Sequence, residues 1–115
     1  MTDGARGEQR AAEYLAQRGY TVLARNYRSP YGEIDLICAH GGCIAFVEVK
    51  TRSSAKFGAP REAVTPAKQR KIILTAQQWL AEHPTALQPR FDVVEVRRAG
   101  ARCRIHLIPN AFEVS

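Results

Sequence analysis

The stretch FVEVKTR, residues 46–52, constrains most strongly how this chain can fold. It continues an apolar run, as a buried strand does, yet it carries Glu48 and Lys50 two residues apart. Side chains of a strand alternate between its two faces, so both charges share one face with Ile44 and Phe46, while the opposite face is apolar. A strand that is apolar on both faces is usually central in its sheet and covered on both sides. The stretch therefore predicts a covered sheet with two charges that are costly to bury unless they are paired or bind a metal.

Helix and strand patterns follow one another along the rest of the chain. Apolar residues at helical spacing predict a first helix over residues 7–19. Thr65, as N-cap, and Pro66 predict the start of a second helix, which ends before Pro84. Runs rich in β-branched and aromatic residues predict five strands, over residues 20–28, 32–39, 42–52, 90–96 and 102–108. The order α-β-β-β-α-β-β predicts an α/β fold, with a mixed five-stranded sheet and helices on both faces.

The composition fits a single domain with a basic surface. The 115 residues suffice for one domain, residues 1–115, and 45% of them are hydrophobic. The formal net charge of +6 favours polyanionic partners such as nucleic acid. The sequence has no apolar run of membrane-spanning length and no signal-peptide core, and its three cysteines form no disulfide framework. We therefore expect a cytoplasmic protein without membrane contact.

The segment CAHGGC, residues 38–43, raises the alternative of a zinc site. Its two cysteines and its histidine could bind zinc together with Cys103. Their spacing differs from the paired-cysteine knuckles of structural zinc sites, and a tight turn accounts better for the two glycines. A buried cysteine usually behaves as a small hydrophobic residue, which favours a structural role for the thiols.

The hairpin around residues 41–42 predicts where the charges of its two strands meet. If the turn is centred there, Asp35 lies opposite Glu48 and Glu33 lies opposite Lys50, all on one face. Directly opposed side chains have Cβ atoms about 5 Å apart, and two carboxylates that close repel unless one is protonated or a cation lies between them. A divalent cation resolves this conflict, and oxygen ligands suit Mg²⁺ or Mn²⁺. The alternative is a set of cross-strand ion pairs on a solvated face, which would not require so apolar a strand.

A family resemblance becomes visible at these residues. The run GEID, residues 32–35, followed by FVEVKTR resembles the PD-(D/E)xK nuclease signature, in which an Asp and a Glu-x-Lys meet at a catalytic metal. The wider pattern resembles the YraN family of bacterial predicted endonucleases, which is distantly similar to archaeal Holliday junction resolvases. The shared motifs run from Gly7 to Phe112: GE, AAEYL, GY, RNYR, GEIDLI, FVEVKTR, FGAP, AVTPAKQRK, RFDVVEV and NAF. The resemblance implies a restriction-endonuclease-like fold, and one departure from the signature is Ile34, where a proline is usual.

The resemblance also implies roles for individual residues. Asp35 and Glu48 would be metal ligands, and Lys50 would be the catalytic lysine. Glu8 would be an additional acidic ligand, and Gln69 would be a catalytic residue contributed by the second helix. Glu8 can equally be an ordinary first-turn glutamate that the helix dipole favours.

The chemistry of phosphodiester hydrolysis explains why such residue types are needed. A bound Mg²⁺ supplies a Lewis acid and lowers the pKa of its water. Lys50 could orient or deprotonate that water, or offset developing negative charge, and the sequence leaves these roles open. It also leaves open whether one metal ion or two take part.

Basic residues around the expected site favour contacts with DNA phosphates, which position a nucleic acid without reading its sequence. We expect such contacts from Arg25, Arg28, Arg52, Lys56, Arg61, Lys68, Arg70 and Lys71. Stacking on unpaired bases, or simple packing at the rim, is expected of Tyr27, Tyr31 and Phe57. A solvated edge or a secondary contact is expected of Arg97, Arg98, Arg102 and Arg104.

Two functions of different class follow from the sequence. The first is a Mg²⁺-dependent deoxyribonuclease that acts on branched, flapped or otherwise irregular DNA, since no sequence-reading motif is present. The second is a non-catalytic DNA-binding or scaffold protein that keeps the nuclease fold. The intact set of Asp35, Glu48 and Lys50 favours the first. The expected partner is DNA, a homodimer is a further option, and the metal is the one expected cofactor.

Overall fold

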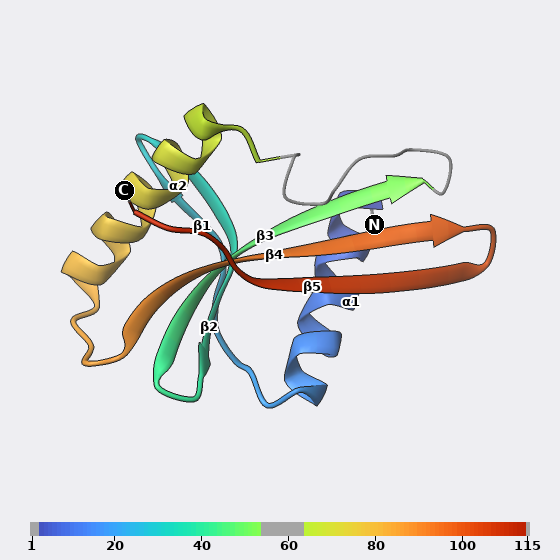
Figure 1. The fold of residues 1–115 in the computed structure, drawn as a ribbon, viewed down its shortest axis with the longest axis horizontal. Coiled ribbons are helices and arrows are strands. Elements are labelled where there is room, and N and C mark those ends of the chain that lie inside the picture. Colours follow the sequence, from blue (N-terminus) through green and yellow to red (C-terminus); the bar gives the residue numbers. More distant parts are fainter. Residues whose placement is uncertain (1–2, 54–63, 115) are drawn as a thin grey trace.

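Two helices and five strands follow one another in the order that the sequence predicts. The computed structural model describes residues 3–53 and 64–114. The elements are α1 (Asp3–Gln17), β1 (Thr21–Ser29), β2 (Gly32–His40), β3 (Cys43–Ser53), α2 (Pro66–Glu82), β4 (Gln88–Ala99) and β5 (Arg102–Phe112). Figure 1 shows how the strands lie between the two helices. Neither helix combines the length and apolar character needed to cross a membrane, within the described ranges.

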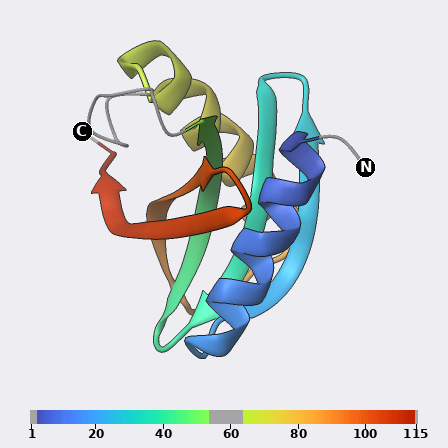
Figure 2. The same cartoon turned by 90° about the vertical axis from the view of Figure 1, so that its right-hand side faces the viewer.

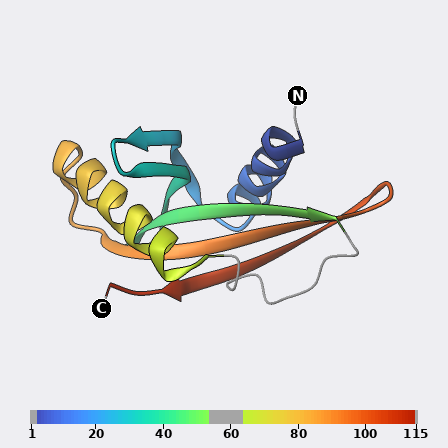
Figure 3. The same ribbon diagram turned by 90° about the horizontal axis from the view of Figure 1, so that it is seen from above.

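The strands form one sheet in the order β1-β2-β3-β4-β5, so β3 is central, as its apolar faces predict. The pair β3–β4 is parallel, and the other three pairs are antiparallel. Parallel neighbours need a crossover connection, and α2 lies in the connection between these two strands. Figure 3 shows β3 and β4 running side by side, with the turn between β4 and β5 beyond the end of β3.

Alternation along β3 divides its side chains between two hydrophobic clusters. On one face, Val47 belongs to a cluster with Leu15 of α1. On the other face, Phe46 meets Trp79 of α2 edge to face, with ring centroids 6.1 Å apart. The helices therefore cover opposite faces of the sheet, and Figure 2 shows α1 in front of the strands with α2 behind them.

The N-terminus of α2 is fixed as the sequence predicts. Thr65 is the N-cap, and its side-chain oxygen accepts a hydrogen bond from the backbone N–H of Lys68 at 3.2 Å. Pro66 occupies the first turn, and the helix ends at Glu82, before Pro84. This cap holds the first turn of α2, including Lys68, in place beside the sheet.

The hairpin of β2 and β3 pairs over only part of its length. The two strands join around residues 41–42 in the predicted register, with Leu36 opposite Val47 as the last pair. Before Leu36, the β2 residues keep their register with β1. The expected cross-strand pairs of Asp35 with Glu48, and of Glu33 with Lys50, are therefore not part of the ladder.

A bend in the β1–β2 ribbon explains why the ladder stops. Ile34 and Ile37 pack in the same cluster although they lie three residues apart, so the alternation of faces is interrupted between them. On β1, Asn26 lies between the residues paired with Leu36 and Ile34, and its φ of 51° is left-handed. Asparagine adopts this conformation more readily than most residues. The bend turns Asp35 toward β3, whereas Glu33 stays paired with Arg28 of β1 and does not pair with β3.

Candidate functional site

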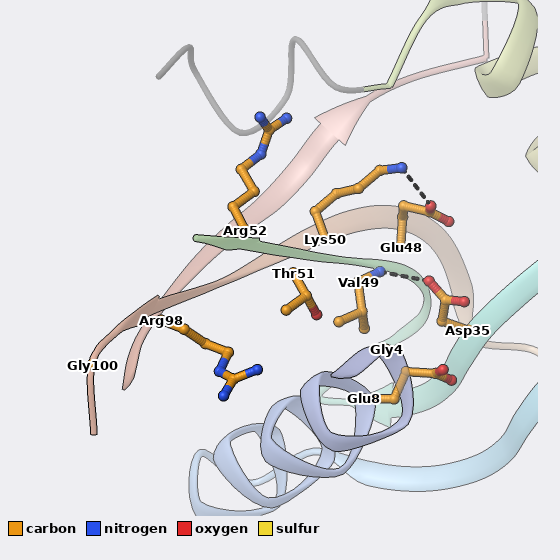
Figure 4. A pocket seen from close by; sticks show the side chains of 10 residues that line it. All are labelled: Gly4, Glu8, Asp35, Glu48, Val49, Lys50, Thr51, Arg52, Arg98 and Gly100. Atoms are coloured by element: carbon orange, nitrogen blue, oxygen red, sulfur yellow. Dashed lines mark hydrogen bonds and ion pairs between the residues drawn. The ribbon is translucent and has the colours of Figure 1, made fainter. Parts of the chain in front are cut away.

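Asp35, Glu48 and Lys50 meet where β2 and β3 part (Figure 4). The Oδ2 atom of Asp35 accepts a hydrogen bond from the backbone N–H of Val49 at 2.7 Å. The Asp35 side chain thus takes up a backbone donor on the edge of β3 that no longer pairs with β2. This bond holds its carboxylate beside Glu48.

Glu48 is buried, and two lysines form ion pairs with one of its carboxylate oxygens. Its exposed fraction is 6%. The Nζ atom of Lys68, from α2, lies 2.6 Å from Glu48 Oε1, and the Nζ atom of Lys50 lies 3.4 Å from the same oxygen. Burial lowers the pKa of Lys50. Burial also acts to lower the pKa of Lys68, but its hydrogen bonds with Glu48 and Lys50 and the charges of Glu48 and Asp35 together outweigh this effect and raise that pKa overall.

Burial and neighbouring carboxylates raise the pKa values of Asp35 and Glu8. Burial, followed by the charge of Glu48, raises the pKa of Asp35 to about 7, and Glu8 adds to the shift. Burial likewise raises the pKa of Glu8, and the charges of Glu33 and Glu48 contribute. Acidic groups from α1, β2 and β3 thus share one electrostatic environment, in which the proton of Asp35 is held to near-neutral pH.

Asn26 bridges two of these acids from the bend of β1. With its amide nitrogen turned toward them, it donates to Glu8 Oε1 at 2.6 Å and to Glu33 Oε1 at 3.3 Å. In the reverse orientation its oxygen would face carboxylate oxygens. The left-handed residue that bends the ribbon therefore also positions the acidic side chains beside it.

Two cavities share Asp35 and Glu48 in their walls. The larger, of about 850 Å³, extends from Glu8 on α1 along β3 to Arg52. The smaller, of about 230 Å³, lies against α2 and is lined by Lys68 among others. The acidic pair is therefore accessible from the α1 side and borders basic groups of α2.

The donor chemistry fits a hard divalent cation. Carboxylate oxygens are the ligands that Mg²⁺ and Mn²⁺ prefer, and a cation would relieve the repulsion that raises the pKa of Asp35. Asp35 and Glu48 would hold it, with Glu8 as a third ligand. As the side chains stand, no three acidic, His or Cys groups within the described ranges converge closely enough on one point to bind an ion. The ammonium group of Lys68 contacts Glu48 instead.

The residue of α2 that contacts Glu48 is Lys68, rather than Gln69. The Nε2 atom of Gln69 donates to the carbonyl of Val64 at 3.0 Å, which ties the helix to the residue before its cap. The catalytic role expected of Gln69 stays a prediction. The sequence predicted phosphate contacts for Lys68, the third residue of α2, and its contact with Glu48 was missed.

The other basic residues are spread over several surfaces. Arg25 donates to Gln9 of α1 at 2.8 Å, and Arg28 is paired with Glu33 at 3.5 Å. Arg70 borders a separate cavity along α2, whereas Lys71 lines the smaller cavity at the acidic pair. Lys56, Phe57 and Arg61 lie outside the described residues. Tyr31 is exposed, and the hydroxyl of Tyr27 donates to Glu82 at 2.6 Å.

The thiols considered for zinc are separated. Cys38 is fully buried in the cluster on the α1 face, and His40 stacks on Tyr20 with ring centroids 4.0 Å apart. Cys103 lies opposite Arg98, close to the turn between β4 and β5. These positions favour structural roles.

Comparisons with known proteins identify the family. Residues 7–96 match the family described as "Uncharacterised protein family UPF0102". A UPF0102 protein of Symbiobacterium thermophilum is 51% identical over 111 residues, which cover 95% of this chain and 94% of that protein. A UPF0102 protein of Syntrophotalea carbinolica is 48% identical over 112 residues, covering 96% and 91%. The chain therefore belongs to the UPF0102 family, the YraN family that its motifs predict.

Proposed function

We propose that this protein is a metal-dependent endonuclease that hydrolyses phosphodiester bonds of branched, flapped or otherwise irregular DNA. One observation carries the proposal: a buried glutamate and an aspartate with a pKa raised to about 7 lie together at the wall of an open cavity, with Lys50 beside them. Perturbed carboxylates and lysines in a cleft are typical of catalytic sites. Mg²⁺ or Mn²⁺ bound there would supply Lewis-acid chemistry to the phosphate and to a water molecule.

The side chains divide the work as follows. The carboxylates of Asp35 and Glu48 are held at fixed positions. Asp35 accepts a hydrogen bond from the backbone N–H of Val49 on β3, and Glu48 is buried. A water oxygen bonds to phosphorus as one ester P–O bond breaks, the water loses a proton, and the departing oxygen gains one. Lys50, with its lowered pKa, is suited to orient the water, accept its proton or offset charge on the phosphate.

A scaffold role is the second candidate, and the ion pair of Lys68 with Glu48 is the observation that favours it. An ammonium group that stays on Glu48 would exclude a metal and leave a DNA-binding protein without catalysis. Under the nuclease proposal, Lys68 leaves Glu48 when a cation or a phosphate group arrives.

The test is a panel of labelled linear, flap and four-way DNAs incubated with Mg²⁺ or Mn²⁺, together with calorimetry of Mn²⁺ binding. Asp35→Asn should lose metal binding and cleavage together. Lys50→Ala should keep metal binding, while its cleavage rate falls by about 10²–10⁴-fold, as is typical of losing a general acid–base group. Glu13→Gln, which removes one exposed negative charge from α1, is the control and should behave as the parent.

The variants separate the two candidates. A parent protein that binds DNA and cleaves none of the substrates with either metal would favour the scaffold role. If Lys50→Ala cleaves as fast as the parent, Lys50 is only an ion-pair partner of Glu48.

A further inference from the structure

Three arginines lie in one row across the sheet, two residues beyond Lys50 along β3. Arg52 on β3 lies opposite Arg97 on β4, and Arg97 lies opposite Arg104 on β5. Neighbouring strands are about 4.8 Å apart, so the row spans about 10 Å. We call Arg52, Arg97 and Arg104 the arginine row. Because residues two apart share a face of a strand, the row faces the same side as Glu48 and Lys50.

Beside the arginine row lies a group that the proposed reaction does not use, the buried carboxylate of Glu95. Glu95 is 1% exposed and lies in the register row of Lys50. Its Oε1 atom bonds to Nε of Arg97, and its Oε2 atom lies 3.3 Å from Nε of Arg52. Despite that distance, the Arg52 contact is an ion pair without an aligned hydrogen bond. One side chain thus positions two arginines from adjacent strands.

The arginine row concentrates positive charge at one place on the sheet. Like charges that face each other across neighbouring strands destabilise a sheet, and a buried carboxylate is costly to desolvate. The three guanidinium groups carry more positive charge than Glu95 offsets. Arg104 is exposed, and Figure 4 shows Arg52 extending from the sheet on the same side as Lys50. Guanidinium groups recognise phosphate oxygens well because their planar donors match the geometry of the anion.

We propose that the arginine row binds the phosphate backbone of the DNA, with Glu95 as its positioning residue. The proposal rests on the proposed function, because it names the contact surface of that same site. The row lies about 6.6 Å from Lys50 along β3, two residues at about 3.3 Å each. A DNA strand that enters at Glu48 and Lys50 would therefore continue across β3, β4 and β5, toward the turn between β4 and β5.

The experiment measures DNA binding in EDTA, by fluorescence anisotropy of labelled four-way and duplex DNA at several salt concentrations. Arg97→Gln and Arg104→Gln should each lower affinity about tenfold at 0.1 M salt and reduce the salt slope by about 0.9, since one phosphate contact is lost. Arg18→Gln is the matched control, because it removes the same charge at the other end of α1, where the guanidinium lies 3.8 Å from the Tyr14 ring centroid. It should change both quantities much less.

Glu95→Gln tests the positioning role by the sign of its effect. If charge alone mattered, removing a negative group would strengthen DNA binding. Positioning predicts weaker binding, because Arg52 and Arg97 lose the carboxylate that holds them. Stronger binding would overturn the role of Glu95. Should this buried substitution prevent folding, Arg104→Gln, at an exposed position, still decides the arginine row.

The outcomes separate this inference from the proposed reaction. If Arg97→Gln and Arg104→Gln bind DNA as well as Arg18→Gln does, the arginine row is refuted, whether or not the parent cleaves DNA. If the row variants lose affinity and the parent never cleaves, the binding surface stands and the nuclease proposal fails. Absence of DNA binding by the parent at low salt would overturn the inference.

Discussion

Lys50 and Lys68 both contact the same carboxylate oxygen of Glu48, Oε1. Charge-assisted contacts of this kind stabilise a buried carboxylate, because they replace the water it has lost. They also compete with any cation that needs the same oxygen. At the residue scale, the resting state of the site is therefore set by Lys68, whose Nζ is the nearer of the two.

Removing Lys68 should make the site a better metal binder. In Lys68→Ala, a cation no longer displaces the ammonium group from Glu48, so affinity for Mn²⁺ should rise by on the order of tenfold, as expected from about 1.5 kcal/mol for one charge-assisted hydrogen bond. Calorimetry with Mn²⁺ measures this. Arg70→Ala, which removes an exposed positive charge of the same helix beside a separate cavity, is the control. Unchanged affinity in Lys68→Ala would mean that Lys68 does not occupy the position of the cation.

The raised pKa of Asp35 predicts how stability depends on pH. The folded protein holds this proton up to about pH 7, whereas the unfolded chain releases it near the ordinary value of 3.8. Stability should therefore fall as pH rises from about 4 to about 7. In EDTA at pH 8, Asp35→Asn should be more stable than the parent by on the order of 4 kcal/mol, since the pKa of Asp35 is raised by about three units and one unit corresponds to about 1.4 kcal/mol. Near pH 4 the two proteins should unfold alike. Urea titrations at both pH values test this, and a parent that is the more stable of the two at pH 8 would contradict it.

At the scale of elements, α1 approaches β3 closely enough that only glycine fits at Gly7. A Cβ atom there would lie 2.0 Å from Oγ1 of Thr51 and 3.3 Å from its Cβ. The residue that follows is Glu8, so this contact also sets how near Glu8 comes to the other acids.

Gly7→Ala should therefore destabilise the protein by about 1–3 kcal/mol, typical of overpacking, although alanine favours a helix by roughly 1 kcal/mol. Thr51→Ala in the same chain should restore most of the loss, because the nearest atom is then absent. Gly42→Ala is the control, since nothing lies within 4 Å of a Cβ atom there. Urea titrations of these three variants and the parent test this. Equal losses for Gly7→Ala with and without Thr51→Ala would refute the close contact.

Strand periodicity predicted the elements and the hairpin register well. The two faces of β3, the cap of α2 and the last pair of Leu36 with Val47 all agree with the sequence. Periodicity could not predict the bend at Asp35, because it assumes that every strand alternates without interruption. The left-handed φ of Asn26 is a local backbone choice that no pattern of apolar residues reveals.

The candidate site was predictable in part for the same reason. Asp35, Glu48 and Lys50 do lie together. The partner from α2 was assigned to Gln69, yet Lys68 makes the contact with Glu48. Neighbouring helix positions point about 100° apart. Which of them faces the site depends on how α2 docks, and the sequence alone does not fix that docking.

At the scale of the whole molecule, two buried acidic networks lie on opposite faces of β4, because Asp92 is paired with Val47 of β3 and Glu95 with Lys50. Asp92 accepts hydrogen bonds from Tyr20, from Arg90 and from the backbone N–H of Asn110, so it links β4 to β5 and to the residue before β1. Glu95, three residues later, instead contacts arginines beside the candidate site. One face of β4 thus holds an acid within a hydrogen-bond network, and the other face holds an acid that contacts two arginines beside the candidate site.

That the site draws on several elements also bears on the order in which the chain folds. Asp35 and Glu48 belong to a hairpin, whereas Lys68 reaches Glu48 only after α2 and the parallel pairing of β3 with β4 have formed. Local pairings close sooner than crossover connections, because less loop entropy is lost. We therefore expect a stage of folding at which the two carboxylates already repel each other and Lys68 has not yet arrived.

Such a stage would act as an electrostatic barrier to folding. Asp35→Asn should refold faster than the parent at pH 8, and the two rates should converge as pH falls well below 4, where Asp35 is protonated in the unfolded chain. Stopped-flow fluorescence of Trp79 follows the reaction, and Glu13→Gln serves as the control for charge loss elsewhere. Equal refolding rates at pH 8 would show that the two acids meet only after the slowest step. If Asp35→Asn does refold faster, the acidic pair that would serve catalysis also slows the assembly of the sheet that holds it.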